Sequence, residues 1–109
     1  MKIYISVLNG PTDETFIRRL PLLIGRALVE SREVLDLNDY DPEKLISQQH
    51  CEITINNDGL KIIDLGSKNG TYIFKDGKLK QIPKDEPYPL SLKDIFVVGP
   101  LLLRVEALE

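Results

Sequence analysis

Short alternations of apolar and polar residues, separated by turn residues, run along most of this 109-residue chain. An alternation with a period of two is typical of strands that are buried on one face. Residues 3–7 alternate in this way, and Asn9-Gly10-Pro11 ends the segment because proline has no N–H for a sheet and glycine accepts a positive φ. The next apolar segments, residues 15–20, 22–24 and 34–37, are predicted as further strands.

The clearest local signal is a hairpin over residues 51–65. Two alternating segments flank Asn57-Asp58-Gly59, a combination typical of a tight turn between antiparallel strands. A second hairpin is predicted over residues 72–82, with its turn at 75–78. Residues 95–98 and 101–105 complete the set as strands around Gly99-Pro100. The pattern therefore continues as strands to the end of the chain.

The remaining segments are predicted as loops. Apart from the strand at 34–37, residues 26–46 are rich in charge and lack a clear period, although 41–45 could form one helical turn with Asp41 as the cap and Pro42 at the first helical position. Three prolines between residues 83 and 89 indicate another loop. Ten to eleven short, mostly antiparallel strands with almost no helical period predict an all-β sandwich or barrel, and the length allows one domain over residues 1–109.

Composition narrows the partners and the compartment. The net charge is −3 and no apolar run is long enough to cross a bilayer, so binding of nucleic acid or of a membrane is not expected. A single cysteine, Cys51, rules out an internal disulfide, and the first residues lack the apolar core of a signal peptide. We therefore expect a cytoplasmic protein, in which any anionic ligand must be held by a local cluster of donors.

Three polar motifs provide such a cluster. They are Gly25-Arg26, Ser47-Gln48-Gln49-His50 and Ser67-Lys68-Asn69-Gly70-Thr71, and they are separated by 20 and 16 residues. A phosphate group is bound by converging donors, and these motifs contain a guanidinium, a hydroxyl, an ammonium and a carboxamide. Each motif lies where a predicted strand meets a loop, so a sandwich could bring all three to one end.

In this order and spacing, the motifs resemble the pattern of forkhead-associated (FHA) domains. Asp64-Leu65-Gly66 and Leu92-Lys93-Asp94-Ile95 add to the resemblance, which extends over residues 22–105. It implies a β-sandwich whose loops at one end bind phosphothreonine peptides. The implied binding residues are the matched Arg26, Ser47 and Asn69 and the variable Gln48 and Lys68.

Other residues of the motifs are expected to support this site. Gly25 is expected to relieve a backbone clash, and the ring of His50 to bond loop backbone and hold Ser47 in place. Gly70 and Thr71 complete the supporting set, with Asn69-Gly70 as a candidate type I′ turn. Cys51 is predicted to be a core residue.

An enzyme is not expected. His50 is the only histidine, and a Ser47–His50–Asp64 triad would lack the strand–turn–helix setting of a nucleophile elbow. One histidine and one cysteine cannot form a structural zinc site, and no nucleotide-binding loop is present, so no metal or cofactor is expected. The predicted partner is a phosphothreonine-containing protein, such as a substrate of a Ser/Thr kinase.

One alternative stays open. Gln48 stands where the family often has a basic residue, which favours weaker attraction of phosphate. The competing hypothesis is a phosphate-independent protein–protein interaction domain of the same fold. FHA domains are commonly parts of longer proteins, so residues 1–109 could be an excised module.

Overall fold

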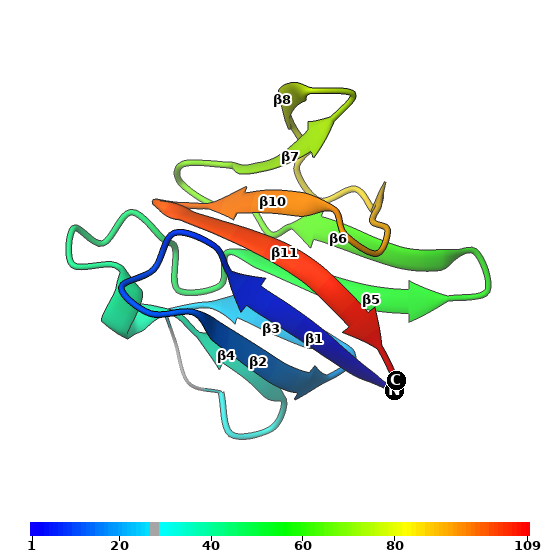
Figure 1. Ribbon diagram of the computed structural model, residues 1–109, viewed down its shortest axis with the longest axis horizontal. Coiled ribbons are helices and arrows are strands. Elements are labelled where there is room, and N and C mark those ends of the chain that lie inside the picture. Colours follow the sequence, from blue (N-terminus) through cyan, green and yellow to red (C-terminus); the bar gives the residue numbers. More distant parts are fainter. Residues whose placement is uncertain (27–28) are drawn as a thin grey trace.

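Two packed β-sheets form the body of the protein (Figure 1). The computed structural model describes residues 1–26 and 29–109, and eleven strands lie within these ranges. The strands are β1 (Lys2–Val7), β2 (Glu14–Arg19), β3 (Leu22–Gly25), β4 (Glu33–Asp36), β5 (Cys51–Asn56), β6 (Gly59–Asp64), β7 (Thr71–Lys75), β8 (Lys78–Gln81), β9 (Tyr88–Pro89), β10 (Ile95–Val98) and β11 (Leu101–Leu108). The all-β prediction is confirmed. Residues 27–28, part of the predicted loop over 26–46, lie outside the described residues.

The two sheets differ in strand order. The six-stranded sheet has the order β2-β1-β11-β10-β7-β8, and the five-stranded sheet has the order β4-β3-β5-β6-β9. Among the named strands, β3 and β4 pair in parallel and the other pairs are antiparallel. Because β1 pairs with β11, the two ends of the chain lie side by side (Figure 1).

The core fills the space between the two sheets. The β5–β6 hairpin illustrates how the sequence specifies it: Cys51 and Ile53 point inward opposite Asp64 and Ile62, in the register expected from the alternation. Phe96 from β10 is fully buried on the facing sheet. Cys51 is a buried free cysteine, and burial raises the pKa of its thiol.

Two local predictions were wrong. A 3₁₀ helix (η1, Asn38–Tyr40) precedes the expected helical turn at 41–45, and Lys44 has a φ of 55°, which an α-helix cannot contain. The loop predicted around residues 83–89 contains β9, which pairs with β6 at the edge of its sheet. Pro89 is tolerated there because an edge strand does not need every N–H for pairing.

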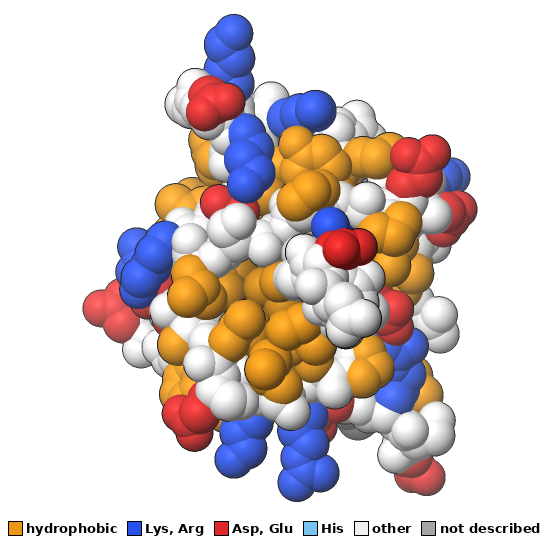
Figure 2. All heavy atoms as spheres, turned by 90° about the vertical axis from the view of Figure 1, so that its right-hand side faces the viewer, with side chains coloured by type: hydrophobic (Ala, Val, Ile, Leu, Met, Phe, Trp, Pro, Cys, Tyr) orange, Lys and Arg blue, Asp and Glu red, His pale blue; other side chains and the backbone are white. Residues whose placement is uncertain are grey.

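The β7–β8 hairpin extends from the body at the top of Figure 1. Asp76 and Gly77 form its two-residue turn with φ values of 52° and 75°, as a type I′ turn requires. Figure 2 shows basic side chains at the top of the molecule, where this hairpin lies. At the other end of β7, Thr71 is fully buried beneath the predicted site. The two ends of this one strand therefore lie in different surroundings.

Candidate functional site

The end of β3 is in close contact with the loop that precedes β5. The Arg26 N–H donates to the carbonyl oxygens of Ser47 (3.3 Å) and Gln48 (3.1 Å). A Cβ atom on Gly25 would lie 2.0 Å from the Gln48 carbonyl oxygen, closer than any side chain permits. Glycine is therefore required at this position for the first two sequence motifs to meet.

The side chain of Arg26 is held on its inner side. Its Nε donates to the Ile46 carbonyl oxygen and lies 3.5 Å from the Asp41 carboxylate. That carboxylate is buried and also accepts the N–H groups of Leu45 (2.9 Å) and Ile46 (2.7 Å). The Arg26 side chain is 19% exposed, and within residues 1–26 and 29–109 neither Nη atom forms a hydrogen bond. The Nη donors can therefore serve a ligand while Nε fixes the guanidinium.

Ser47 joins the second and third motifs. Its Oγ accepts the N–H of Lys68 at 2.9 Å, so the hydroxyl proton remains available for another acceptor. Its own N–H donates to Nδ1 of His50 at 3.1 Å. Ser47 is thus held in two ways: its hydroxyl oxygen is bound by the Lys68 N–H, and its backbone N–H is bound to the His50 ring.

His50 is neutral and uses both ring nitrogens within the protein. Since Nδ1 accepts a backbone N–H, the proton lies on Nε2, which donates to the Gly70 carbonyl oxygen at 2.8 Å. Burial lowers the pKa of this fully buried side chain, and the bond to Gly70 and the charges of Asp64 and Asp41 offset only part of that effect. Neither nitrogen can act as the base of a Ser47–His50–Asp64 triad.

The third motif returns to the same place. Nδ2 of Asn69 donates to the Leu45 carbonyl oxygen at 2.8 Å. Asn69 thus binds Leu45, Arg26 binds Ile46, and Lys68 binds Ser47. These three acceptor residues are consecutive in the chain. Five predicted residues gather at this rim of the sandwich: Arg26, Ser47, Gln48, Lys68 and Asn69. The last two and Gln48 are exposed, and Arg26 and Ser47 are partly buried.

A buried carboxylate shapes the loop that carries Lys68 and Asn69. Asp64 accepts the N–H groups of Gly66 and Ser67, the Ser67 hydroxyl at 2.6 Å and the Thr71 hydroxyl at 2.7 Å. Burial alone would raise its pKa, but these hydrogen bonds outweigh burial and lower it. Asp64 is thus an ionised anchor that closes the turn between β6 and β7.

The turn at Asn69-Gly70 differs from the type I′ geometry that was considered. Gly70 has a φ of 82°, whereas Asn69 is not among the described residues with positive φ, and a type I′ turn needs both. The Asn69 side chain instead reaches across to Leu45. A Cβ atom at Gly70 would lie 2.6 Å from Nε2 of Gln81, so this glycine also leaves room for the end of the Gln81 side chain.

Asp41 is the functional-site residue that sequence reasoning missed. Asp41-Pro42 was interpreted as the start of a helical turn, but the carboxylate faces Arg26 and the 45–46 backbone. The one available signal was its position, an acidic residue in the loop between two motifs rich in hydrogen-bond donors.

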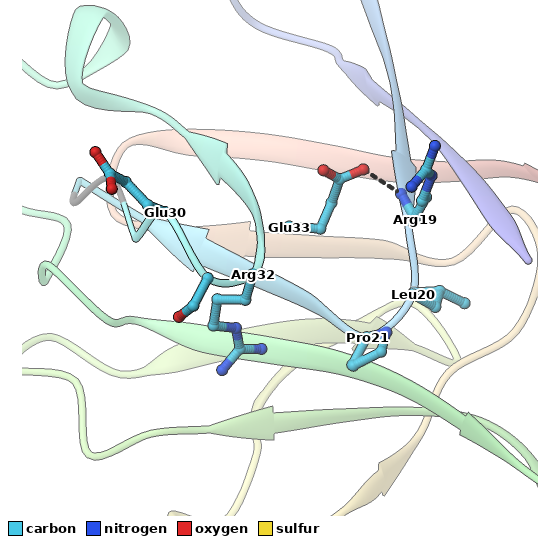
Figure 3. Close-up of a pocket in the computed structure, with 7 residues that line it drawn as sticks. Arg19, Leu20, Pro21, Glu30, Arg32 and Glu33 are labelled. Atoms are coloured by element: carbon cyan, nitrogen blue, oxygen red, sulfur yellow. Dashed lines mark hydrogen bonds between the residues drawn. The ribbon is translucent and has the colours of Figure 1, made fainter.

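A separate hollow lies beside the ends of β2 and β4 and contains none of the predicted site residues (Figure 3). Glu33 accepts the backbone N–H of Arg19 there, and Arg32 is paired with Glu52. The Arg19 and Arg32 side chains lie on different sides of the hollow and do not converge (Figure 3). Because acidic and basic side chains both line this hollow, it is a less favourable site for an anion than the rim around Arg26.

Within the described ranges no group of three or more histidine, cysteine or acidic side chains could hold a metal ion. No helix there has the length and apolar character to cross a membrane.

Two mostly antiparallel sheets in this order, with the three motifs at one rim, define an FHA-type β-sandwich. A family model described as "FHA domain" matches residues 22–99, and the chain belongs to this family. No curated protein sequence matches the chain.

Solved structures share the fold. The FHA domain of the CT664 protein from Chlamydia trachomatis is 26% identical, with a TM-score of 0.71 and 100% of both chains covered. An FHA domain of an Arabidopsis thaliana hypothetical protein is 19% identical, with a TM-score of 0.72, over 99% of this chain and 86% of that one. The MEK1 FHA domain, solved with a phosphothreonine peptide of HOP1, is 22% identical, with a TM-score of 0.60, over 95% of this chain and 94% of that one.

Proposed function

We propose that this FHA domain binds phosphothreonine-containing protein segments at the rim formed by Arg26, Ser47, Gln48, Lys68 and Asn69. One observation carries the proposal: the Arg26 and Asn69 side chains and the Lys68 backbone N–H bind the consecutive residues Leu45 to Ser47, which joins the three motifs while their remaining side-chain donors stay available. The structural similarity to an FHA domain solved with a phosphothreonine peptide supports it. The domain would act as an interaction module in cytoplasmic signalling or assembly and would catalyse no reaction.

Each donor has a defined part in the proposal. The Nη atoms of Arg26 and the Ser47 hydroxyl would bind the phosphate, which carries nearly two negative charges at neutral pH. Asn69 keeps a free carboxamide oxygen and one N–H, which suit a peptide backbone. Lys68 adds a cation. Gln48 adds none, although the family often has a basic residue at this position. Charge-assisted hydrogen bonds contribute roughly 1.5–3 kcal/mol each, which after the cost of ordering a peptide leaves about micromolar affinity.

Pre-organisation favours binding over a merely structural role. Arg26 is fixed at Nε by Ile46, and its pairing with Asp41 offsets part of its charge without occupying the Nη donors. A guanidinium that is already oriented loses less entropy when it binds an anion. This pre-organisation supports a binding role for the rim even though Gln48 supplies no charge.

The test compares phosphorylated and unmodified peptides. Fluorescence anisotropy would be measured with peptides selected from a phosphothreonine library and with the same peptides after dephosphorylation. We expect Arg26→Ala to weaken binding at least about tenfold, because a charge-assisted pair is lost. Arg19→Ala removes an exposed guanidinium on β2 and is the matched control, expected to change affinity less than about twofold.

Thermal unfolding of each variant would separate loss of the site from loss of the fold. If dephosphorylation, Arg26→Ala and Ser47→Ala all leave partner binding intact in folded protein, the phosphate-independent assembly hypothesis replaces the proposal.

A further inference from the structure

The backbone of β8 is open along one side. β8 is the last strand of the six-stranded sheet, and no strand in the described part of the chain pairs with its outer side. The N–H of Ile82 donates to Thr71, and hydrogen-bonded pairs alternate along an antiparallel ladder. Lys78 and Lys80 therefore bond β7, whereas the N–H and C=O groups of Leu79 and Gln81 point outward.

Side chains along this edge alternate in chemistry. Lys78 and Lys80 project toward one side, where a groove between β8 and β9 is also lined by Tyr88. The Lys80 ammonium lies 5.3 Å from the centre of the Tyr88 ring. On the other side, Leu79 lies opposite Phe74, and these side chains are 52% and 39% exposed. Along the edge, a cation, an apolar side chain and a second cation therefore follow one another at Lys78, Leu79 and Lys80, on alternating faces of the sheet.

The two lysines form no ion pair among the described residues, and the exposed Asp76 of the turn is the acidic residue that lines their groove. The described ion pairs include Lys75 with Asp94 but none with Lys78 or Lys80. The whole chain carries a net charge of −3, so a basic edge runs against its overall charge. Figure 2 shows basic side chains on both sides of an acidic one where the hairpin projects. An acidic partner complements this edge.

We propose that the edge of β8 is a second binding surface, which takes an extended acidic peptide as an added antiparallel strand. Directly opposed residues in an antiparallel pair share a face of the sheet, so the peptide would carry an acid–apolar–acid sequence. Its acidic side chains would face Lys78 and Lys80, and its apolar side chain would pack against Leu79 on the face of the sheet that also carries Phe74. Main-chain bonds to Leu79 and Gln81 would hold the strand. This surface is independent of phosphate binding at the rim.

Two other readings of the edge are less favourable. Pairing of β8 with a second copy of itself would bring lysines next to lysines, and like charges across a ladder are destabilising. Lysines on an edge strand often serve only to prevent aggregation. The exposed apolar pair Leu79–Phe74 beside open backbone distinguishes this edge from one that is only protected.

The probe is an unphosphorylated peptide, acetyl-Ser-Thr-Glu-Val-Glu-Thr-Ser-amide. Two-dimensional NMR titration would follow the backbone amides. We expect the largest shift changes at residues 78–81, slower amide exchange at Leu79 and Gln81, and little change at Ser47 and Asn69. A peptide of the same composition with the order Glu-Glu-Val breaks the alternation and is expected to bind at least about fivefold more weakly.

Variants test charge and backbone separately. Lys78→Glu/Lys80→Glu is expected to weaken binding of the probe at least about tenfold, through loss of attraction and added repulsion. The control Lys2→Glu/Arg19→Glu makes the same charge change at the opposite end of the same sheet, on β1 and the edge strand β2, and should alter affinity less than about threefold. Leu79→Pro removes the outward N–H but none of the bonds to β7, so it should abolish binding while the hairpin stays folded.

The proposal is overturned by any of three results in folded protein. The first is equal weakening by the two charge-reversed pairs, which would mean general attraction to a basic surface. The second is probe-induced shifts centred on residues 47 and 67–69, which would place the peptide at the rim. The third is unchanged binding by Leu79→Pro. Arg26→Ala should leave probe binding intact, so failure at the rim and failure at β8 are distinguishable.

Discussion

β7 connects two regions that are built on opposite principles. At its start, the rim is held by buried polar groups: Asp41, His50 and Asp64 have their hydrogen-bonding atoms satisfied inside the protein. At its end, the β7–β8 hairpin exposes every residue of β8 and leaves part of its backbone open. A ligand at the proposed rim site would meet donors that are already fixed, whereas a peptide at the proposed β8 edge would have to become ordered as a strand.

The difference has an energetic consequence. Buried polar networks are costly to disrupt because each lost bond leaves a desolvated partner. Exposed lysines and open backbone remain solvated, so changes there affect stability little and affect binding selectively. Substitutions in the two regions should therefore separate stability from recognition.

The largest effect is expected for glycine substitutions that contrast the two regions. Gly25→Ala places a Cβ atom 2.0 Å from the Gln48 carbonyl, so the rim loop must move, at a cost of about 3 kcal/mol in unfolding free energy. At Gly77, in the hairpin turn, an added Cβ atom meets no atom within 4 Å. Gly77→Ala should therefore lower the unfolding free energy by only about 1 kcal/mol, because alanine disfavours the positive φ of this position. Urea unfolding would measure both. Equal costs would mean that the rim loop adapts as freely as the hairpin.

A smaller effect is expected from pH through His50. Its pKa in the folded protein lies below the ordinary value of 6.5, so as the pH falls below 6.5 the unfolded chain binds a proton that the folded chain excludes. The contribution of neutral His50 to the unfolding free energy is therefore fully present above pH 6.5. Below this pH the unfolding free energy decreases, by at most about 1.4 kcal/mol per pH unit. The midpoint of thermal unfolding between pH 8 and pH 5 measures the decrease.

His50→Gln is the control for this pH dependence, because it removes the titrating group. At pH 8 the thermal unfolding midpoint of His50→Gln should be lower than that of the original protein. Between pH 8 and pH 5 it should change less with pH. Gly77→Ala should keep the slope of the original protein. A slope in His50→Gln as steep as in the original chain would assign the effect to other groups.

The alternation of side chains was sufficient to predict the all-β class, whereas the choice of a sandwich over a barrel came from the resemblance of the motifs. A period of two over residues 51–65 places Cys51 and Ile53 inside and determines the β5–β6 register. β9 could not be predicted in the same way, because two residues that include Pro89 carry no period and pair only once β6 is in place. Residues 41–45 failed for a different reason: a local helix-start signal is overridden by the contact of Asp41 with Arg26.

The rim could be predicted only in part. The spacing of Arg26, Ser47 and Asn69 suggested a common site through a resemblance, and the structure brings these residues together. What spacing could not provide is which atoms are already used. Nε of Arg26 and one N–H of Asn69 are bound within the protein, and that depends on the path of the loop over residues 45–47.

The smallest effect is expected beside the turn of the hairpin. Lys75 donates to Asp94 at 2.7 Å, but both side chains are partly exposed, so Lys75→Gln should cost less than about 1 kcal/mol in unfolding free energy. Added salt should reduce even this cost, because exposed pairs are screened. Urea unfolding at low and high ionic strength measures the effect. A cost above about 2 kcal/mol that resists salt would mean that the hairpin, like the rim, depends on a desolvated polar contact, and the contrast between the two ends of β7 would then be wrong.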